Sequence, residues 1–328
     1  MEQKSMDPQD DVPLVFVHRP PSFHFPFKDR LSTHFHLLDP LDSPDSTHFV
    51  RRHANSIRVL LCVDPTPISS DLLDLLPSLQ LIVGSSVGVD HLDLSDCRRR
   101  GIAITNAGVA FSEDVADLAV GLLIDVLRGI SAADRFVRSG FWVKTGDYPL
   151  GFKLGGKRIG IVGLGNIGSQ VAKRLEAFGC IISYNSRRKK PPSVPFAYYA
   201  NIYDLAMNSD VLMVCCALTE ETHHIVNKEV MAALGKEGVI INVGRGDLID
   251  EKEMVQFLVR GEIGGVGLDV FENEPDVPKE LFQLDNVVLS PHSAVATPEC
   301  FDALEELILF NLKAFFSNEP LRSLVEFE

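Results

Sequence analysis

Residues 157–190 read KRIGIVGLGNIGSQVAKRLEAFGCIISYNSRRKK, and this stretch decides the fold. It opens on an apolar run, 159–162, that is typical of a strand buried on both faces of a parallel sheet. The apolar positions of a helix follow and share one face: Ile167, Val171, Leu175 and Phe178. A second apolar run at 180–184 predicts another strand, so the stretch has the strand–helix–strand order of a βαβ unit.

Three glycines in G-x-G-x-x-G spacing stand between the first strand and the helix. The first glycine permits a tight turn, the second lets the backbone approach a pyrophosphate, and the third lets helix and strand pack closely. The spacing alone is a weak signal, but between a strand and a helix it is a strong one. The free N–H groups at the start of the helix favour phosphate. We therefore predict a dinucleotide site with contacts from Gly163, Leu164, Gly165, Asn166, Ile167 and Gly168.

The residues after the second strand indicate which dinucleotide binds. A unit that takes NAD(H) carries Asp or Glu at this strand end, where the carboxylate bonds the ribose 2′-hydroxyl. Here the position holds Ser186, followed by Arg187, Arg188, Lys189 and Lys190. No carboxylate is present here to repel a 2′-phosphate, and the guanidinium groups can bind one. The sequence therefore predicts NADP(H) in preference to NAD(H), with Ser186, Arg187 and Arg188 at the 2′-phosphate.

Composition excludes several classes of protein. The chain has 328 residues, enough for two domains, and its 45% hydrophobic and 23% charged residues are typical of globular proteins. The net charge of −14 argues against nucleic acid or an anionic membrane surface as the main partner. The cysteines and histidines show no zinc spacing, so no metal is expected.

Several observations bear on the compartment. No apolar run reaches the roughly 18 residues of a membrane span. The acidic start MEQKSMDPQDD is unlike a signal or transit peptide, and the final VEFE lacks the S-K-L of a peroxisomal address. Several of the six cysteines lie in apolar runs, which is typical of buried free thiols in a reducing compartment. We therefore expect a cytosolic protein.

Two groups of predicted strands define two α/β domains. Strands of the first group are predicted at 13–17, 57–63, 79–83 and 102–105. The second group has six strands, namely the two above and those at 211–216, 239–242, 265–270 and 286–290. Strands that alternate with helices predict parallel sheets with right-handed crossovers.

Helices are predicted between these strands and at both domain boundaries. A helix of weak periodicity is expected within 20–47, a short one at 72–76, and a long one from Ser112. A second helix and a loop are expected within 131–150. The amphipathic segment 298–316 predicts a final helix that packs back on the first domain and makes that domain discontinuous.

Three polar residues stand just beyond strands of the second sheet, where ligands of open α/β sheets bind. They are Arg245, Glu274 and His292. A guanidinium can hold a carboxylate with two hydrogen bonds, and a histidine beside a glutamate stays protonated closer to neutral pH. Each residue alone could equally serve a structural role, but their shared position at strand ends favours a catalytic site.

The chain resembles the D-isomer-specific 2-hydroxyacid dehydrogenases along nearly its full length, and within them the plant NADPH-dependent glyoxylate/hydroxypyruvate reductases and hydroxyphenylpyruvate reductases. The resembling motifs are Ser86–Asp90 (SVGVD), Gly163–Gly168, Asn242–Gly246 (NVGRG), Gly267–Phe271 (GLDVF) continuing to Glu274-Pro275, and Pro291-His292. The resemblance implies two Rossmann-like domains. A smaller, flavodoxin-like substrate domain would span 1–106 and 293–328, and a doubly wound parallel-sheet cofactor domain would span 107–292.

The resemblance also implies roles for individual residues. His292 would donate a proton to the carbonyl oxygen of a 2-oxoacid, Glu274 would tune His292, and Arg245 would bind the substrate carboxylate. Further substrate contacts would come from Ser86, Val87, Gly88 and Trp142, the last in the arm through which the family forms homodimers. Further cofactor contacts would come from Cys216, Thr222, Val243, Gly244, Arg245, Asp269 and His292. The family usually has proline where this chain has Ala217.

These features predict NADPH-dependent reduction of hydroxypyruvate to D-glycerate and of glyoxylate to glycolate. Reduction of 4-hydroxyphenylpyruvate is an alternative within the same family. A dinucleotide-sensing, corepressor-type interaction protein is a further alternative, since fold alone does not establish function. The sequence leaves open the preferred 2-oxoacid, the physiological direction, the strength of the dimer, and whether Trp142 reaches the partner's active site.

Overall fold

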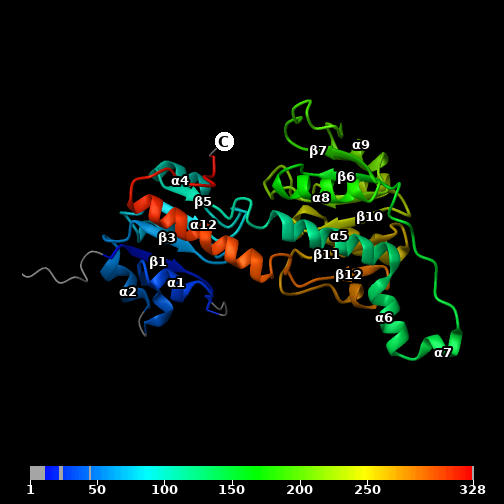
Figure 1. The fold of residues 1–328 in the computed structure, drawn as a ribbon, viewed down its shortest axis with the longest axis horizontal. Helices are drawn as coiled ribbons and strands as arrows, with labels where there is room; N and C mark the ends of the chain where they lie inside the picture. The colour runs from blue at the N-terminus through cyan, green and yellow to red at the C-terminus, as the bar shows by residue number, and fades with distance from the viewer. Residues whose placement is uncertain (1–11, 22–24, 44–45, 327–328) are drawn as a thin grey trace, which may run out of the picture. The chain divides into compact units, whose positions relative to one another are not determined.

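The computed structural model describes residues 12–21, 25–43 and 46–326, and the chain divides into two compact units (Figure 1). Unit 1 comprises Met1–Phe111 and Pro298–Glu328, and unit 2 comprises Ser112–Thr297. The functional roles assigned above to the two domains stay predictions.

Unit 1 is built on a five-stranded parallel sheet with the order β2-β1-β3-β4-β5. Its strands are β1 (Leu14–His18), β2 (His36–Leu38), β3 (Val59–Cys62), β4 (Leu81–Gly84) and β5 (Ala103–Thr105). All four residues of β3 and of β4 are buried, as expected for central strands with helices on both faces. The four predicted strands are present, and β2 was missed because it has only three residues and lies in a stretch of weak periodicity.

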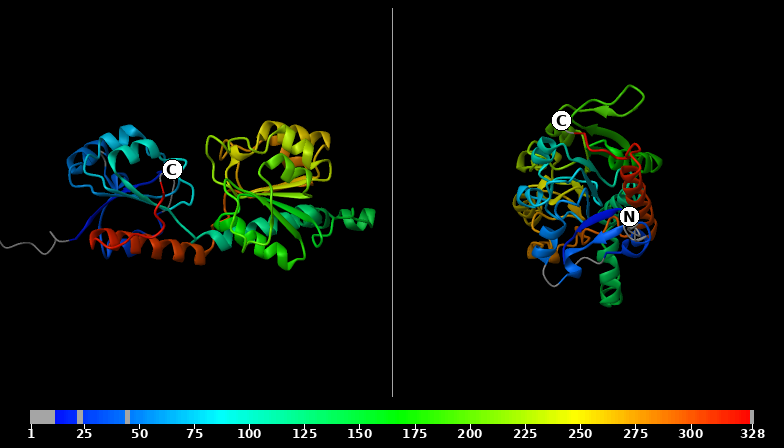
Figure 2. Two further views of the ribbon diagram at one scale, coloured as in Figure 1. Left: turned by 90° about the horizontal axis from the view of Figure 1, so that it is seen from above. Right: turned by 90° about the vertical axis from the view of Figure 1, so that its left-hand side faces the viewer.

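The helices of unit 1 cover both faces of this sheet, with α12 along one face and α4 along the other (Figure 2). They are α1 (Lys28–Ser32), η2 (Pro40–Asp42), α2 (Ser46–His53), α3 (Ser70–Asp74), α4 (Leu94–Arg100) and α12 (Pro298–Phe316). The predicted return of the last helix is confirmed, because α12 packs on β4. Its buried residues Leu304, Ile308 and Leu312 recur at helical spacing.

Unit 2 is built on a seven-stranded parallel sheet with the order β12-β11-β10-β9-β6-β7-β8. Its strands are β6 (Arg158–Val162), β7 (Ile181–Asn185), β8 (Ala197–Tyr198), β9 (Val211–Val214), β10 (Val239–Asn242), β11 (Gly265–Leu268) and β12 (Val287–Leu289). The six predicted strands are present and the predicted doubly wound α/β fold is confirmed. The seventh strand, β8, has two residues, too few for a recognisable alternation.

The helices of unit 2 also lie on both faces of the sheet, α5 and α8 on one and α9, α10 and α11 on the other (Figure 2). They are α5 (Ser112–Arg128), α6 (Ile130–Arg138), α7 (Phe141–Thr145), α8 (Asn166–Ala177), α9 (Ile202–Met207), α10 (Lys228–Leu234), η3 (Gly246–Leu248), α11 (Glu251–Arg260) and η4 (Lys279–Gln283). In α8, Val171 and Leu175 are buried as predicted. Ile167 is half-buried, whereas Phe178 follows the last turn as the C-cap and is 49% exposed.

The strand order reverses between β6 and β9, which are neighbours in the sheet although β7 and β8 lie between them in sequence. Parallel α/β sheets form a crevice at such a point, just beyond the carboxyl ends of the strands. The loops after β6 and β9 therefore flank the expected position of a dinucleotide.

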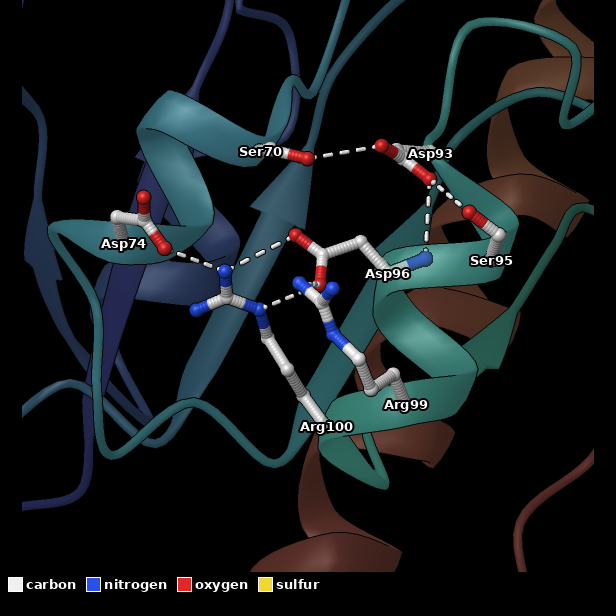
Figure 3. Close-up of polar contacts among 7 residues, drawn as sticks. All are labelled: Ser70, Asp74, Asp93, Ser95, Asp96, Arg99 and Arg100. Atoms are coloured by element: carbon white, nitrogen blue, oxygen red, sulfur yellow. Dashed lines mark hydrogen bonds and ion pairs between the residues drawn. The ribbon is translucent and has the colours of Figure 1, made fainter.

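A polar network in unit 1 ties α4 to α3 (Figure 3). Asp93, the N-cap of α4, accepts from the Asp96 N–H at 2.9 Å and from the Ser70 hydroxyl at 2.9 Å. The Asp96 carboxylate is buried and accepts two hydrogen bonds from the Arg100 guanidinium, at 2.9 and 3.0 Å. Arg100 also contacts Asp74. The network fixes the end of the loop that follows β4 and carries the predicted substrate contacts.

This network predicts a loss of stability in acid. The bond from Arg100 outweighs desolvation and lowers the pKa of Asp96 to about 2. In the unfolded chain this pKa is about 3.9. Ionised Asp96 therefore stabilises the fold fully above about pH 4, and the contribution disappears as the pH falls to about 2. The Asp96→Asn substitution should lower the urea midpoint measured by circular dichroism at pH 6, and by about half as much at pH 3. An equal shift at both values would contradict this assignment.

Candidate active site

The glycine turn between β6 and α8 has the geometry that a pyrophosphate requires. Gly163 has a φ of +95°, and a Cβ there would lie 2.5 Å from the Cα of Cys216. A Cβ at Gly165, by contrast, would meet no atom within 4 Å, so this side of the turn is open to a ligand. Gly165 is also the N-cap of α8 and provides no side-chain cap. The first N–H groups of the helix can therefore serve an anion, and the residues present fit a dinucleotide.

The loop after β7 places the predicted 2′-phosphate residues at the surface. Arg187 and Arg188 are exposed, whereas Ser186 is half-buried. The Ser186 hydroxyl donates to the Arg188 carbonyl at 2.8 Å, so it closes the loop here and would have to rotate to donate to a phosphate. The buried Tyr184 hydroxyl accepts from the Lys190 N–H at 2.8 Å. The two guanidinium groups are thus carried by a turn fixed at both ends.

The loop after β9 carries two further predicted cofactor residues. Thr222 holds this loop closed, because its hydroxyl accepts from the Thr219 N–H and donates to the Ala217 carbonyl, both at 2.8 Å. Cys216 is half-buried, and burial raises the pKa of its thiol to about 12. A neutral thiol beside Gly163 is compatible with a bound nucleotide.

The turn after β10 presents Arg245. The buried side chain of Asn242 organises this turn, accepting from the Gly244 N–H at 3.0 Å and donating to the Arg245 carbonyl at 2.8 Å. Val243 is buried, and Arg245 is half-buried. The guanidinium donates to the Gly244 carbonyl at 2.9 Å. Sequence reasoning missed the role of Asn242, although a polar residue at the end of an apolar strand is a usable signal.

The loops after β11 and β12 bring together Glu274 and His292. The distance between Glu274 Oε2 and His292 Nδ1 is 2.7 Å. The other carboxylate oxygen of Glu274 accepts from the Phe271 N–H at 3.0 Å. Because Nδ1 donates to the carboxylate, Nε2 is the ring nitrogen available to a substrate. This pairing is the one that the sequence predicts, while its catalytic role stays a prediction.

Electrostatics within the pair favour a protonated histidine. The hydrogen bond to Glu274 raises the pKa of His292 against the effect of desolvation, and the charges of Glu274 and Asp269 add to the increase while Arg245 opposes it. Desolvation tends to raise the pKa of Glu274, but the bonds from His292 and the Phe271 N–H lower it overall. The arrangement is therefore a carboxylate beside an imidazolium, with a guanidinium near enough to influence both.

Asp269 supports the His292 loop in a way that sequence reasoning did not foresee. Its buried carboxylate accepts from the N–H groups of Ser293 and Ala294 at 2.9 and 3.1 Å. Its carbonyl accepts from the His292 N–H at 2.8 Å. His292 has a φ of +51°, a conformation that non-glycine residues rarely adopt, and these three bonds hold it there. The predicted contact of Asp269 with nicotinamide stays a prediction.

The remaining predicted substrate residues lie in other parts of the chain. In unit 1, the Ser86 hydroxyl donates to the Gly88 carbonyl, and the side-chain amide of Asn106 donates to the Val87 carbonyl, both at 2.8 Å. Trp142 lies in α7 of unit 2 and is 59% exposed. The structure thus assembles Arg245, Glu274 and His292 within one unit and places Ser86, Val87 and Gly88 in the other.

Among residues 12–21, 25–43 and 46–326, no group of three or more His, Cys, Asp or Glu side chains could hold a metal ion. No helix among these residues is both long and apolar enough to cross a membrane.

Comparisons with known proteins place this geometry in a family. The model of the D-isomer specific 2-hydroxyacid dehydrogenase NAD-binding domain matches residues 120–294. The chain is 61% identical to a glyoxylate/hydroxypyruvate reductase of Arabidopsis thaliana, over 98% of this chain and all of the relative. It is 47% identical to a hydroxyphenylpyruvate reductase of Plectranthus scutellarioides, over 90% of this chain and 93% of the relative.

A solved structure gives the same result. The NADPH-dependent glyoxylate/hydroxypyruvate reductase of Sinorhizobium meliloti, in complex with NADP and malonate, matches with a TM-score of 0.88 and 36% identity, over 96% of this chain and 97% of that one. The chain therefore belongs to the D-isomer-specific 2-hydroxyacid dehydrogenases, and the resemblance noted in the sequence is confirmed.

Proposed function

We propose that this protein reduces hydroxypyruvate to D-glycerate and glyoxylate to glycolate with NADPH. The observation that carries the proposal is the 2.7 Å pair of His292 and Glu274 at the carboxyl edge of a dinucleotide-binding sheet. A raised pKa of His292 suits a group that must donate a proton near neutral pH.

In the proposed mechanism, each residue acts through the contacts described above. The nicotinamide, when bound, supplies the hydride to the carbonyl carbon. Arg245 binds the substrate carboxylate and polarises the carbonyl, which orients it for attack. His292 Nε2 delivers its proton to the carbonyl oxygen as negative charge develops there, yielding the 2-hydroxyacid. Glu274 stabilises the imidazolium before transfer and holds the ring in place throughout.

The preference for NADP(H) over NAD(H) is supported by the loop after β7. Arg187 and Arg188 are exposed on a turn where an NAD-specific site has a carboxylate. The relative of known structure contains NADP. Cation pairs on a fixed turn suit a phosphate dianion, which accepts several charge-assisted hydrogen bonds.

Among substrates, hydroxypyruvate and glyoxylate are favoured over 4-hydroxyphenylpyruvate. The relative with 61% identity is a glyoxylate/hydroxypyruvate reductase, whereas the hydroxyphenylpyruvate reductase is 47% identical. The corepressor-type alternative is disfavoured because the relatives of 61% and 47% identity are both reductases.

We further propose a cytosolic homodimer formed through the α6–α7 arm, which extends from unit 2 (Figure 1). The arm and the segment after it expose several large apolar side chains: Ile130, Val137, Phe141, Trp142, Val143, Leu150 and Phe152. Val143 is 94% and Leu150 98% exposed, and a concentration of exposed apolar side chains in one segment favours a protein interface. In this proposal unit 1 serves as the substrate domain and unit 2 as the cofactor domain.

The substrate and cofactor assignments predict a specific pattern of turnover. Oxidation of NADPH and NADH at 340 nm should be measured with hydroxypyruvate, glyoxylate, pyruvate and 4-hydroxyphenylpyruvate. We expect the fastest turnover with NADPH and hydroxypyruvate or glyoxylate. Arg187→Asp should reverse the cofactor preference, because its carboxylate repels a 2′-phosphate. No turnover with any of the four acids, while NADPH still binds, would refute the reductase assignment. An unchanged cofactor preference in Arg187→Asp would show that the 2′-phosphate binds elsewhere.

The proton-donor assignment predicts the behaviour of His292→Ala. Loss of the general acid should lower kcat by roughly 10²- to 10⁴-fold. NADPH affinity, measured by fluorescence titration, should remain close to that of the wild type, because the glycine turn and the 2′-phosphate loop are untouched. Wild-type turnover by the variant would rule out this mechanism.

A further inference from the structure

A second group of ionisable side chains contacts the loops that carry Arg245 and Glu274. It connects the loops after β9, β10 and β11 and comprises His224, Asp247, Glu251 and Glu272; we name it the loop-linking cluster. His224 Nε2 and Glu272 Oε1 are 2.8 Å apart. The His224 N–H donates to the Asp247 carbonyl at 2.7 Å. His224 thus binds one neighbouring loop through its backbone and the other through its ring.

Glu251 and Glu272 form a reciprocal pair. The Glu272 carboxylate accepts from the Glu251 N–H at 3.1 Å, and the Glu251 carboxylate accepts from the Glu272 N–H at 3.2 Å. Glu251 is the first residue of α11, where an N–H lacks a partner within the helix and a negative charge is favourable. The pair therefore fastens the loop after β11 to the start of a helix.

Both catalytic turns rest on this fastening. The residue before Glu272 is Phe271, whose N–H holds the Glu274 carboxylate at 3.0 Å. On the other side, a Cβ at Gly246 would lie 1.9 Å from the Phe271 carbonyl carbon and 2.3 Å from the Glu272 nitrogen. The turn that carries Arg245 is therefore packed against the same two residues. A shift of Glu272 would therefore move the Phe271 N–H, which donates to Glu274. It would also move the backbone atoms against which the Arg245 turn packs.

With His223, the cluster places three carboxyl groups and two imidazole rings close together. Burial raises the pKa of Glu251, and the nearby charges of Glu272 and Asp247 add to this effect, while the Glu272 N–H opposes it. His224 bonds directly to Glu272, and its ring stacks on that of His223, with the ring centroids 3.9 Å apart. His223 Nε2 in turn is 3.9 Å from an Asp247 carboxylate oxygen.

We propose that His224, Glu251 and Glu272 are positioning residues that set the geometry of Arg245 and Glu274 for proton donation by His292. None of the three is expected to touch the substrate or the dinucleotide. The inference rests on the proposed function, since it concerns the same reaction. It adds a second layer of residues on which the strength of the Glu274–His292 bond depends.

Kinetics of Glu272 variants test the proposal. Glu272→Ala removes the acceptor for the Glu251 N–H and for His224. The Phe271 N–H that donates to Glu274 is then no longer held in place, and the Glu274–His292 bond weakens. We expect kcat with hydroxypyruvate to fall about tenfold or more, with KM for NADPH unchanged. The alkaline limb of the kcat profile should move to lower pH, because the pKa of His292 falls as its bond weakens. Glu272→Gln keeps an accepting oxygen and should restore most of both properties.

Asp276→Ala is the matched control, because it removes an exposed carboxylate from the same loop, and it should leave kcat and the alkaline limb unchanged. A purely structural role of Glu272 would lower the melting temperature and the active fraction without moving the limb. An unmoved limb in Glu272→Ala would overturn the proposal, as would an equal movement in Asp276→Ala.

A titration of the His292 imidazole by NMR separates failure of this inference from failure of the proposed function. If the wild type reduces none of the 2-oxoacids, the proposed function is refuted, yet the titration still reports on positioning. We expect His292 to titrate at lower pH in Glu272→Ala than in the wild type or Asp276→Ala. The same midpoint in all three proteins would contradict the positioning role.

Discussion

The hydrogen bond between Glu274 and His292 is the interaction on which the rest of the site depends. It joins two loops that follow adjacent strands, β11 and β12, and it gives the imidazole both its orientation and its charge. His292 occupies a left-handed conformation that three bonds to Asp269 maintain, and Glu274 is fixed by the Phe271 N–H.

The topology explains why these loops meet. All strands of the unit 2 sheet are parallel, so each of their carboxyl ends opens at the same edge. Buried polar side chains at the strand ends, Asn242 and Asp269, then shape the loops through bonds to backbone N–H and carbonyl groups. Buried polar groups need partners, and here the loop backbone provides them.

Sequence patterns predicted a large part of this architecture. The glycine spacing and the long apolar strands are local signals, and the helix Pro298–Phe316 was predicted from periodicity alone. Strands β2 and β8 were missed because two or three residues carry no period. The hydrogen bonds of the Thr222 and Ser186 hydroxyls could not be predicted either, because each hydroxyl bonds to a backbone carbonyl within its own loop.

The positions of Arg245, Glu274 and His292 at one edge of the sheet were predictable because each residue follows a strand that is recognisable in sequence; their catalytic role stays a proposal. Their supporting residues were not. The reciprocal bonds of Glu251 and Glu272, and the contact of Gly246 with Phe271, depend on the distance between loops that are 20 or more residues apart in sequence. No periodicity encodes such distances, because they follow from the register of two neighbouring strands, β10 and β11.

Glu274 raises the pKa of His292 through the hydrogen bond between them, and an NMR titration of the His292 imidazole in the wild type and in Glu274→Gln tests this most directly. The His292 resonances can be assigned by comparison with His292→Ala. Glutamine preserves the size of the side chain and a hydrogen-bond acceptor but removes the negative charge. The account predicts a wild-type midpoint above the ordinary value for histidine, about 6.5, and a clearly lower midpoint in Glu274→Gln. Equal midpoints in the two proteins would contradict it.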